Sequence, residues 1–111
     1  MSKIQLESNI LKKLQNYMTV KIKERGFEDE SLHERLLLLT EELGELVNAC
    51  RKVSGMNVDK NRQITNKTGE EIVDIINMVF AVAIKLGLDV EKEFIKKEQI
   101  IDMRTYKRNH F

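Results

Sequence analysis

Carboxylate side chains gather at helical spacing in two short stretches of the sequence. In the first, TEELGEL at residues 40–46, Glu41, Glu42 and Glu45 lie three or four positions apart. In the second, GEEIVDII at residues 69–76, Glu71 and Asp74 lie three positions apart. Residues at these spacings share one face of an α-helix, where like charges repel each other. The pattern therefore indicates two acidic helix faces that need a partner of opposite charge.

Asp74 is the most informative of these carboxylates. It stands in IVDII, whose apolar neighbours predict a buried position, and no lysine or arginine lies within one helical turn of it on that segment. An unpaired charge in a protein interior is strongly unfavourable, so Asp74 needs a partner. If the two segments pack side by side, the converging carboxylates are Glu42, Glu45, Glu71 and Asp74. All-oxygen ligands without cysteine or histidine favour Mg²⁺ or Mn²⁺ over zinc, so we predict such a site.

Single residues in this set have plainer explanations. Glu71 completes a capping-box pattern with Thr68, and Glu41 fits an ordinary solvent-facing position. Gly44 is either a tolerated helix defect or a means for a phosphate or another helix to approach closely. Two paired motifs together are harder to explain in this way than either motif alone.

Two helices are expected before the long polar stretch in the middle of the chain. Apolar residues at three- and four-residue steps predict the first from about Ser2 to Arg25, and Gly26 ends it. The second begins with the capping-box pattern from Ser31 to Glu34 and ends at SG, residues 54–55. The glutamates of TEELGEL therefore fall in the middle of this second helix.

Two more helices are expected after that stretch. The third runs from Thr68 to Gly87 and is apolar nearly all round, which predicts that it is the central and most buried helix. Asp89 is placed to cap the fourth, whose inward face is expected to hold Val90, Phe94, Ile101 and Tyr106. No strand-like alternation occurs. The fold class predicted is all-α, a four-helix bundle-like chain with a long loop between its second and third helices.

The segment at 54–68, SGMNVDKNRQITNKT, is that long loop. It is polar and without clear period, and loops of such length in compact domains are usually functional or disordered. It carries Lys60, Arg62 and Lys67. We therefore expect it to close over a bound anionic ligand as a lid.

Composition narrows the class of protein further. The 111 residues predict one domain, 1–111, and 19 basic against 18 acidic residues exclude the basic excess of a nucleic-acid coat. The single cysteine, Cys50, excludes a disulfide framework and is expected to be a small core residue of a cytoplasmic protein. No apolar run is long enough to span a membrane, and the first residues do not have the pattern of a signal peptide.

EELGEL followed, after a loop, by GEEIVDII resembles the signature of the MazG-like, all-α nucleoside triphosphate pyrophosphatases, EExxE, a spacer and ExxD. The stretches ERGF at 24–27 and LGLDVEKEF at 86–94 resemble further parts of that family, so the resemblance covers roughly residues 20–105. It implies Mg²⁺-dependent hydrolysis of a nucleoside triphosphate between the α- and β-phosphates, giving a monophosphate and pyrophosphate. It also implies a homo-oligomer, either a dimer or a tetramer built as a pair of dimers.

The resemblance also implies roles for individual residues. Glu42, Glu45, Glu71 and Asp74 would be metal ligands, and Glu41 is the candidate to position the attacking water. The expected catalytic residues are therefore Glu41 and Glu42. The expected phosphate-binding cations are Arg51, Lys52 and Lys67. Asn77 would contact the sugar or base of the nucleotide, or else make an interhelical hydrogen bond.

Two other classes of function compete with this one. A ferritin-like di-iron bundle needs two Glu-x-x-His pairs, which the sequence does not hold. A non-catalytic helical oligomerisation or interaction protein would explain the apolar faces of the helices but not a buried Asp74. A Mg²⁺ titration separates these readings, because a pure scaffold should have no specific Mg²⁺ site.

Overall fold

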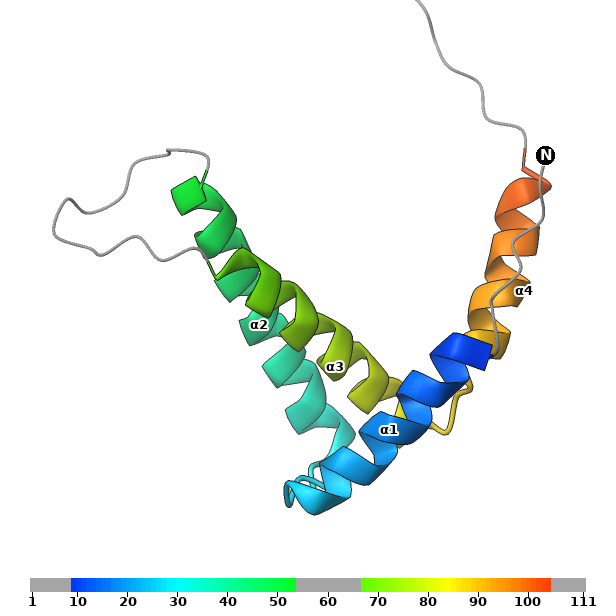
Figure 1. Cartoon of the computed structure of the whole chain (residues 1–111), viewed down its shortest axis with the longest axis horizontal. Helices are drawn as coiled ribbons and strands as arrows, with labels where there is room; N and C mark the ends of the chain where they lie inside the picture. Colours follow the sequence, from blue (N-terminus) through cyan, green and yellow to red (C-terminus); the bar gives the residue numbers. More distant parts are fainter. Residues whose placement is uncertain (1–8, 54–66, 105–111) are drawn as a thin grey trace, which may run out of the picture.

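A computed structural model describes residues 9–53 and 67–104 of the chain. These residues form four α-helices and no strand: α1 (Ile10–Glu24), α2 (Leu32–Val53), α3 (Thr68–Leu86) and α4 (Val90–Asp102) (Figure 1). The predicted all-α class with four helices is confirmed. Parts of the predictions lie outside the described residues: the start of the first helix at residues 2–8, the lid loop at 54–66 with Lys60 and Arg62, and Tyr106.

Local sequence signals set most of the helix ends. The Glu34 amide donates to Ser31 Oγ (3.1 Å) and the Ser31 amide donates to Glu34 Oε1 (3.4 Å), so the predicted capping box of α2 is confirmed. Gly26 and Gly87 follow α1 and α3 with φ of 80° and 70°, a conformation that glycine adopts without strain. The Asp89 side chain caps α4 by accepting a hydrogen bond from the Lys92 amide (3.2 Å).

The start of α3 differs by one residue from the prediction. Lys67 is the N-cap, and Thr68, predicted to be the cap, is the first residue of the helix. The Glu71 amide donates to the Lys67 carbonyl (2.9 Å), which begins the helical hydrogen-bond ladder. This small shift leaves Glu71 in the first turn of α3, on the side that faces α2.

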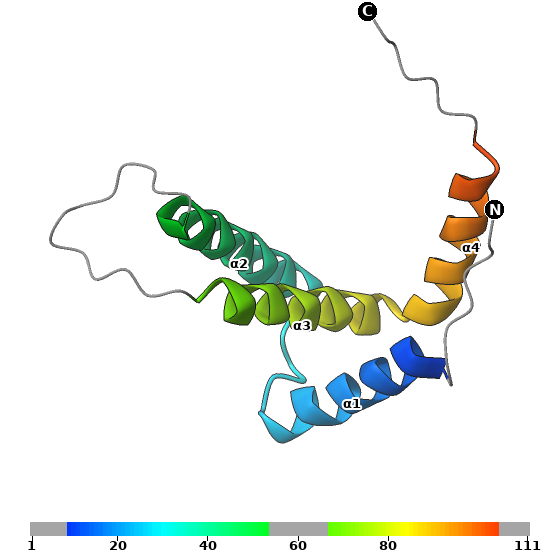
Figure 2. The ribbon, with the colours of Figure 1, turned by 45° about the horizontal axis from the view of Figure 1, so that its top comes forward.

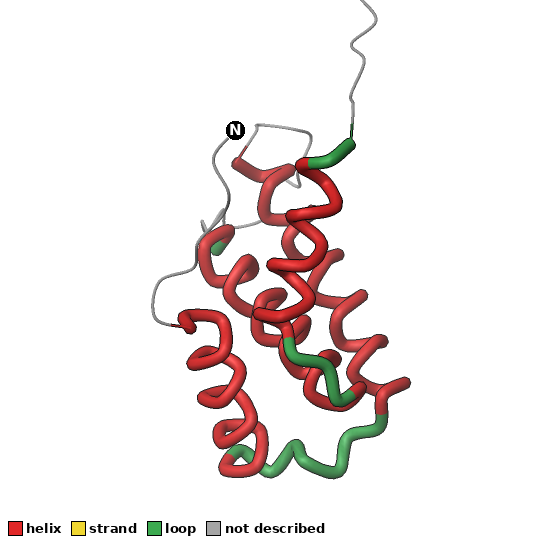
Figure 3. Tube along the Cα trace, turned by 90° about the vertical axis from the view of Figure 1, so that its right-hand side faces the viewer, coloured by secondary structure: helices red, strands yellow, loops and turns green. Residues whose placement is uncertain are grey.

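α2 and α3 lie side by side and antiparallel and make the most extensive contact of the fold (Figures 1 and 2). α1 packs on α3, and α4 contacts α1 and points away from the α2–α3 pair. The main apolar cluster joins α1 to α3 through Met18, Ile22, Phe80 and Ala81. Figure 3 shows the same arrangement from the side, with short turns joining α1 to α2 and α3 to α4.

Polar side chains tie the turns to neighbouring helices. Arg35 of α2 is 2% exposed and donates from Nη1 to the Ala81 carbonyl of α3 (2.6 Å) and from Nη2 to the Phe27 carbonyl (3.2 Å). Lys12 of α1 pairs with Asp89 at the start of α4 (2.8 Å). These contacts fix the turn after α1 to α2, and the turn before α4 to α1.

Burial is less extensive than the sequence pattern predicts. Among the described residues, six apolar side chains are buried: Met18, Ile22, Ala49, Phe80, Ala81 and Ala83. α3 contacts both α2 and α1 and holds three of these six residues, as expected of the central and most buried helix. It nevertheless leaves five apolar side chains exposed: Ile72, Val73, Ile76, Val79 and Leu86. The predicted inward face of α4 has no buried residue, and Cys50, predicted to be a core residue, is exposed.

No helix among the described residues combines the length and the hydrophobicity needed to cross a membrane.

Candidate metal centre

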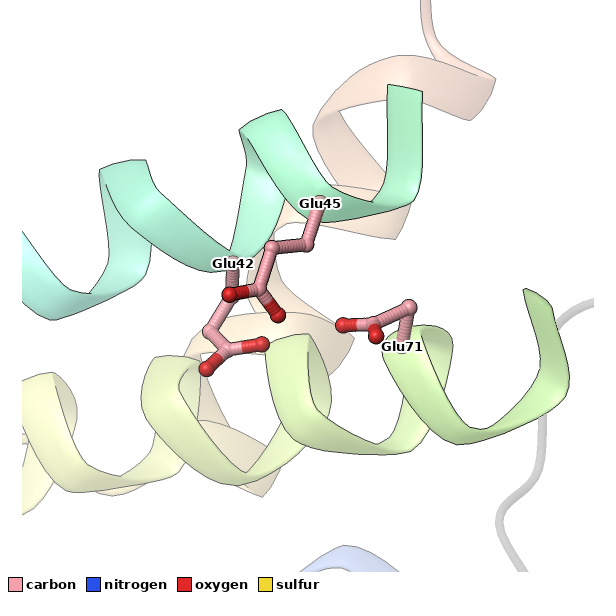
Figure 4. A group of neighbouring side chains, drawn as sticks. All are labelled: Glu42, Glu45 and Glu71. Carbon is pink, nitrogen blue, oxygen red and sulfur yellow. The ribbon is translucent and has the colours of Figure 1, made fainter. Parts of the chain in front are cut away.

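Three carboxylates converge between α2 and α3, as the spacing of the two acidic motifs predicts. Glu42 and Glu45 project from neighbouring turns of α2, and Glu71 reaches toward them from the first turn of α3 (Figure 4). One oxygen of each carboxylate lies within 4.8 Å of one oxygen of each of the others. The antiparallel packing of α2 on α3 therefore brings together side chains that are 26 or more positions apart in the chain.

The same group has polar atoms without a partner. Glu42 Oε2 and Glu71 Oε2 are both buried and accept no hydrogen bond. A buried carboxylate oxygen without a donor is unfavourable, and three carboxylates in one place add mutual repulsion. A divalent cation that binds oxygen would relieve both effects, so the donor set fits Mg²⁺ or Mn²⁺.

The surroundings of these carboxylates also shift their pKa values. Burial, followed by repulsion from Glu45 and Asp74, raises the pKa of Glu42 from 4.5 to about 7. Burial and a hydrogen bond with Glu45 raise the pKa of Glu71 as well. Both shifts have the sign expected of carboxylates that lack a neighbouring cation.

Asp74 lies beside this group and not inside it. Its side chain is exposed, so the prediction that it is buried was wrong. The reason is that its apolar neighbours Ile72, Val73 and Ile76 are themselves exposed and do not enclose it. Its charge nevertheless contributes to the raised pKa of Glu42, which places it within electrostatic reach of the three glutamates.

A hollow of about 200 Å³ adjoins the carboxylates on one side. Glu45 and Glu71 line it together with Lys52 and Lys67, two of the predicted phosphate-binding cations. Lys52 lies in the last turn of α2, and Lys67 is the N-cap of α3. The antiparallel arrangement thus places both lysines around the hollow beside the acidic group.

A second hollow, of about 180 Å³, adjoins the carboxylates on the other side. Glu42 and Asp74 line it together with Asn77, the predicted contact to sugar or base. The rest of its lining comes mainly from α1, the following turn and α3: Met18, Ile22, Arg25, Phe27, Glu30, Met78 and Ala81. It combines a largely apolar floor with a few polar groups, as sites for small organic ligands usually do.

Two predicted site residues lie apart from these features. Glu41 is exposed and is not one of the three converging carboxylates, although it shares a flank of α2 with Glu45, four positions on. Arg51 is exposed in the last turn of α2 and lines neither of the two hollows. The sequence correctly predicted the helix that carries these two residues, but their side chains lie outside the group formed by Glu42, Glu45 and Glu71.

Sequence reasoning missed Arg25, Glu30 and Arg35. Arg25 and Glu30 line the second hollow, and Arg35 binds the carbonyls of Phe27 and Ala81, two of its lining residues. One signal was present in the sequence: Arg35 stands among leucines, four positions before Leu39 and seven before Glu42, on the side of the helix that faces α3. A charged residue at such a position indicates a buried polar contact.

The chain was compared with protein-family models, with curated proteins and with solved structures, and none of the three comparisons found a match.

Proposed function

We propose that this chain is a Mg²⁺-dependent nucleoside triphosphate pyrophosphohydrolase, which cleaves its substrate between the α- and β-phosphates. The observation that carries the proposal is the convergence of Glu42, Glu45 and Glu71, with two buried oxygens that lack a partner. The resemblance of the two acidic motifs to the MazG-like signature supplies the reaction class.

The surroundings of the three glutamates support a triphosphate substrate. Lys52 and Lys67 line the hollow beside Glu45 and Glu71 and would bind the phosphates that leave as pyrophosphate. The hollow on the other side, which Asn77 lines, would take the sugar and base. The bond to be cleaved would then lie beside the carboxylates that separate the two hollows.

The carboxylates would have distinct tasks in this reaction. Glu42, Glu45 and Glu71, with Asp74 nearby, would hold the divalent cation, which supplies charge neutralisation at the phosphate oxygens and raises the acidity of the attacking water. Glu41, on the flank of α2 that Glu45 shares, would orient that water. The oxygen of the water bonds to the α-phosphorus, the bond from that phosphorus to the bridging oxygen breaks, and a carboxylate accepts the proton.

A panel of nucleoside triphosphates with Mg²⁺ tests the proposal, scored by whether pyrophosphate or phosphate appears. We expect pyrophosphate, and we expect Glu42→Gln and Glu71→Gln to lower kcat/KM by about 10²-fold or more, as removal of a charge-stabilising group usually does. Glu70→Gln is the matched control, because Glu70 is an exposed neighbour outside the group and its loss should have little effect. Release of phosphate, or equal losses in all three variants, would contradict the proposal.

The alternative function is a non-catalytic helical oligomerisation protein. The exposed apolar side chains of α2 and α3 favour it, because such surfaces usually bind other chains. The two functions differ in their response to Mg²⁺. A chain that is inactive on every nucleotide and whose melting temperature ignores Mg²⁺ would fit the alternative alone.

A further inference from the structure

The second hollow contains one carboxylate that the proposed reaction does not use. Glu30 lies in the turn between α1 and α2 and lines this hollow of about 180 Å³ together with Glu42 and Asp74. Glu42 is one of the three converging carboxylates and Asp74 lies beside them, so both would act on the phosphate end of a bound nucleotide. Glu30 is half-buried, whereas Glu28, two positions earlier in the same turn, is exposed and does not line the hollow. The Glu30 carboxylate is therefore placed to contact a different part of a ligand in the hollow.

Arg35 fixes the place of Glu30. The Arg35 side chain is 2% exposed, and its Nη1 and Nη2 donate to the Ala81 carbonyl (2.6 Å) and the Phe27 carbonyl (3.2 Å). Its Nε is buried, donates no hydrogen bond and lies 3.9 Å from Glu30 Oε1. The main chain therefore orients the guanidinium, and the guanidinium attracts one oxygen of Glu30 by its charge. Because a carboxylate has several lone-pair sites, Glu30 can still accept hydrogen bonds from a ligand.

The apolar lining of the second hollow suits a flat heterocyclic ring. Its apolar residues are Met18, Ile22, Phe27, Met78 and Ala81. Phe27 is 50% exposed, and an aromatic side chain that is open in this way can stack on a base. Methionine side chains adapt to irregular shapes and contact aromatic rings favourably. Such a lining would hold a ring by its faces, which leaves the edge of the ring to the polar groups.

We propose that Glu30, held in place by Arg35, contacts the edge of the base and selects bases that carry an exocyclic amino group over bases with a carbonyl in its place. The inference rests on the proposed function, because it takes the second hollow to be the base site. An ionised carboxylate accepts hydrogen bonds and donates none, and an amino group of a base supplies the donor. A carbonyl oxygen facing Glu30 would leave two acceptors together in a partly dehydrated place, which is unfavourable. Cytosine is therefore expected in preference to uracil, and adenine in preference to hypoxanthine.

The other polar groups of the second hollow should not replace Glu30 in this choice. Asn77 has a side-chain amide, which both donates and accepts, so it can bond either kind of base. Arg25 only donates and would favour a carbonyl, but its side chain is exposed, so water competes for its hydrogen bonds. Glu30 is the less exposed of these two charged residues, and an ion pair holds it. Its preference should therefore decide which base is accepted.

Pairs of substrates with an amino group or a carbonyl at one position of the base test the proposal. We would measure kcat/KM with Mg²⁺ for CTP against UTP and for ATP against ITP. In each pair that the wild type hydrolyses, the amino member should be favoured by about tenfold or more. Glu30→Gln should lower that preference by about tenfold, because a glutamine amide can donate to a carbonyl. Glu28→Gln is the matched control and should keep the wild-type preference, since Glu28 is exposed in the same turn and does not line the hollow.

Arg35→Lys tests the positioning role of Arg35. An ammonium group lacks the planar fork of donors that binds the carbonyls of Ala81 and Phe27, so Glu30 should be held less firmly and part of the preference should be lost. The ratio of kcat/KM for two substrates does not depend on the fraction of folded protein. A purely structural role of Arg35 would therefore leave the ratio unchanged, and that result would overturn the positioning role.

A binding measurement separates this inference from the proposed activity. The α,β-imido analogues of dCTP and dUTP, which resist cleavage between those phosphates, are titrated into the protein with Mg²⁺ in a calorimeter. Tighter binding of the dCTP analogue by the wild type but not by Glu30→Gln would support the role of Glu30 even in a chain that hydrolyses no nucleotide. Release of pyrophosphate with the same preference in wild type and Glu30→Gln would overturn that role and leave the hydrolase activity standing. A wild-type preference for the carbonyl member, or binding of neither analogue, would overturn it as well.

Discussion

Glu42 couples the protonation of the acidic group to folding. Its pKa is about 7 in the folded chain against an ordinary value of 4.5, so between these pH values the folded state holds a proton that unfolding releases. The free energy of unfolding from this group therefore falls as pH rises from 4.5 to 7 and is constant above that range.

The first prediction follows from that sign. Without divalent cations, the melting temperature of the wild type should fall between pH 4.5 and 7 relative to that of Glu42→Gln, which cannot ionise at this position. Mg²⁺ should restore the wild type at the upper end of the range and have little effect on the variant, because the cation competes with the proton. Parallel pH profiles of the two proteins, with and without Mg²⁺, would contradict it.

Gly44 has no packing role inside the chain. A Cβ at this position would meet no atom within 4 Å, so the described residues do not require a glycine there. We therefore expect Gly44→Ala to stabilise the protein by about 0.5–1 kcal/mol, the cost of glycine in a helix interior. Urea unfolding measures this change. If Gly44→Ala instead lowers nucleotide hydrolysis or self-association without loss of stability, the glycine serves a contact from outside the chain.

At the scale of the elements, the helix ends were predicted from the sequence more accurately than the exposure of individual side chains. Ser31, Asp89 and the two glycines after α1 and α3 act on backbone within a few residues, so their effects are readable from sequence. The meeting of Glu42 with Glu71 followed from helical spacing plus one assumption, that the two helices are neighbours. The burial of Asp74 and Cys50 was predicted wrongly because it depends on what covers each helix face, which spacing alone does not contain.

Arg35 links α2 to α3 and to the turn that follows α1. Arg35→Ala removes hydrogen bonds to the carbonyls of Ala81 and Phe27 and leaves a cavity where the buried side chain was. We expect a loss of about 2–4 kcal/mol in the free energy of unfolding. Lys12→Ala is the control for the loss of a polar contact between elements, because the exposed Lys12–Asp89 pair should contribute no more than about 1 kcal/mol. Equal effects in the two variants, measured by denaturant unfolding, would contradict this ranking.

For the whole molecule, the described residues bury six apolar side chains and leave many others exposed. Exposed apolar side chains lie on α1, at Ile10, Leu14 and Tyr17, as well as on α2 and α3. The homo-oligomer suggested by the sequence would cover such side chains, and it stays a prediction. Association would give a chain of this length a larger core than it builds alone.

Association of this kind makes stability depend on concentration. If a second copy binds the folded chain and not the unfolded one, the melting temperature should rise with protein concentration. A wild-type melting temperature that ignores dilution would show that folding of one copy does not need the other.

The side-chain amide of Gln15 bonds both sides of the turn between α3 and α4. Its Nε2 donates to the Leu88 carbonyl (2.7 Å), and its Oε1 accepts from the Val90 amide (2.9 Å). The first amide of a helix has no partner within the helix, so α1 supplies the one that α4 lacks. Hydrogen exchange at Val90 should therefore report the detachment of α1, and Gln15→Ala should accelerate it without affecting the Glu93 amide, whose acceptor is the Asp89 carbonyl. The start of α4 would open to solvent whenever α1 leaves, so these two helices would unfold as one cooperative unit.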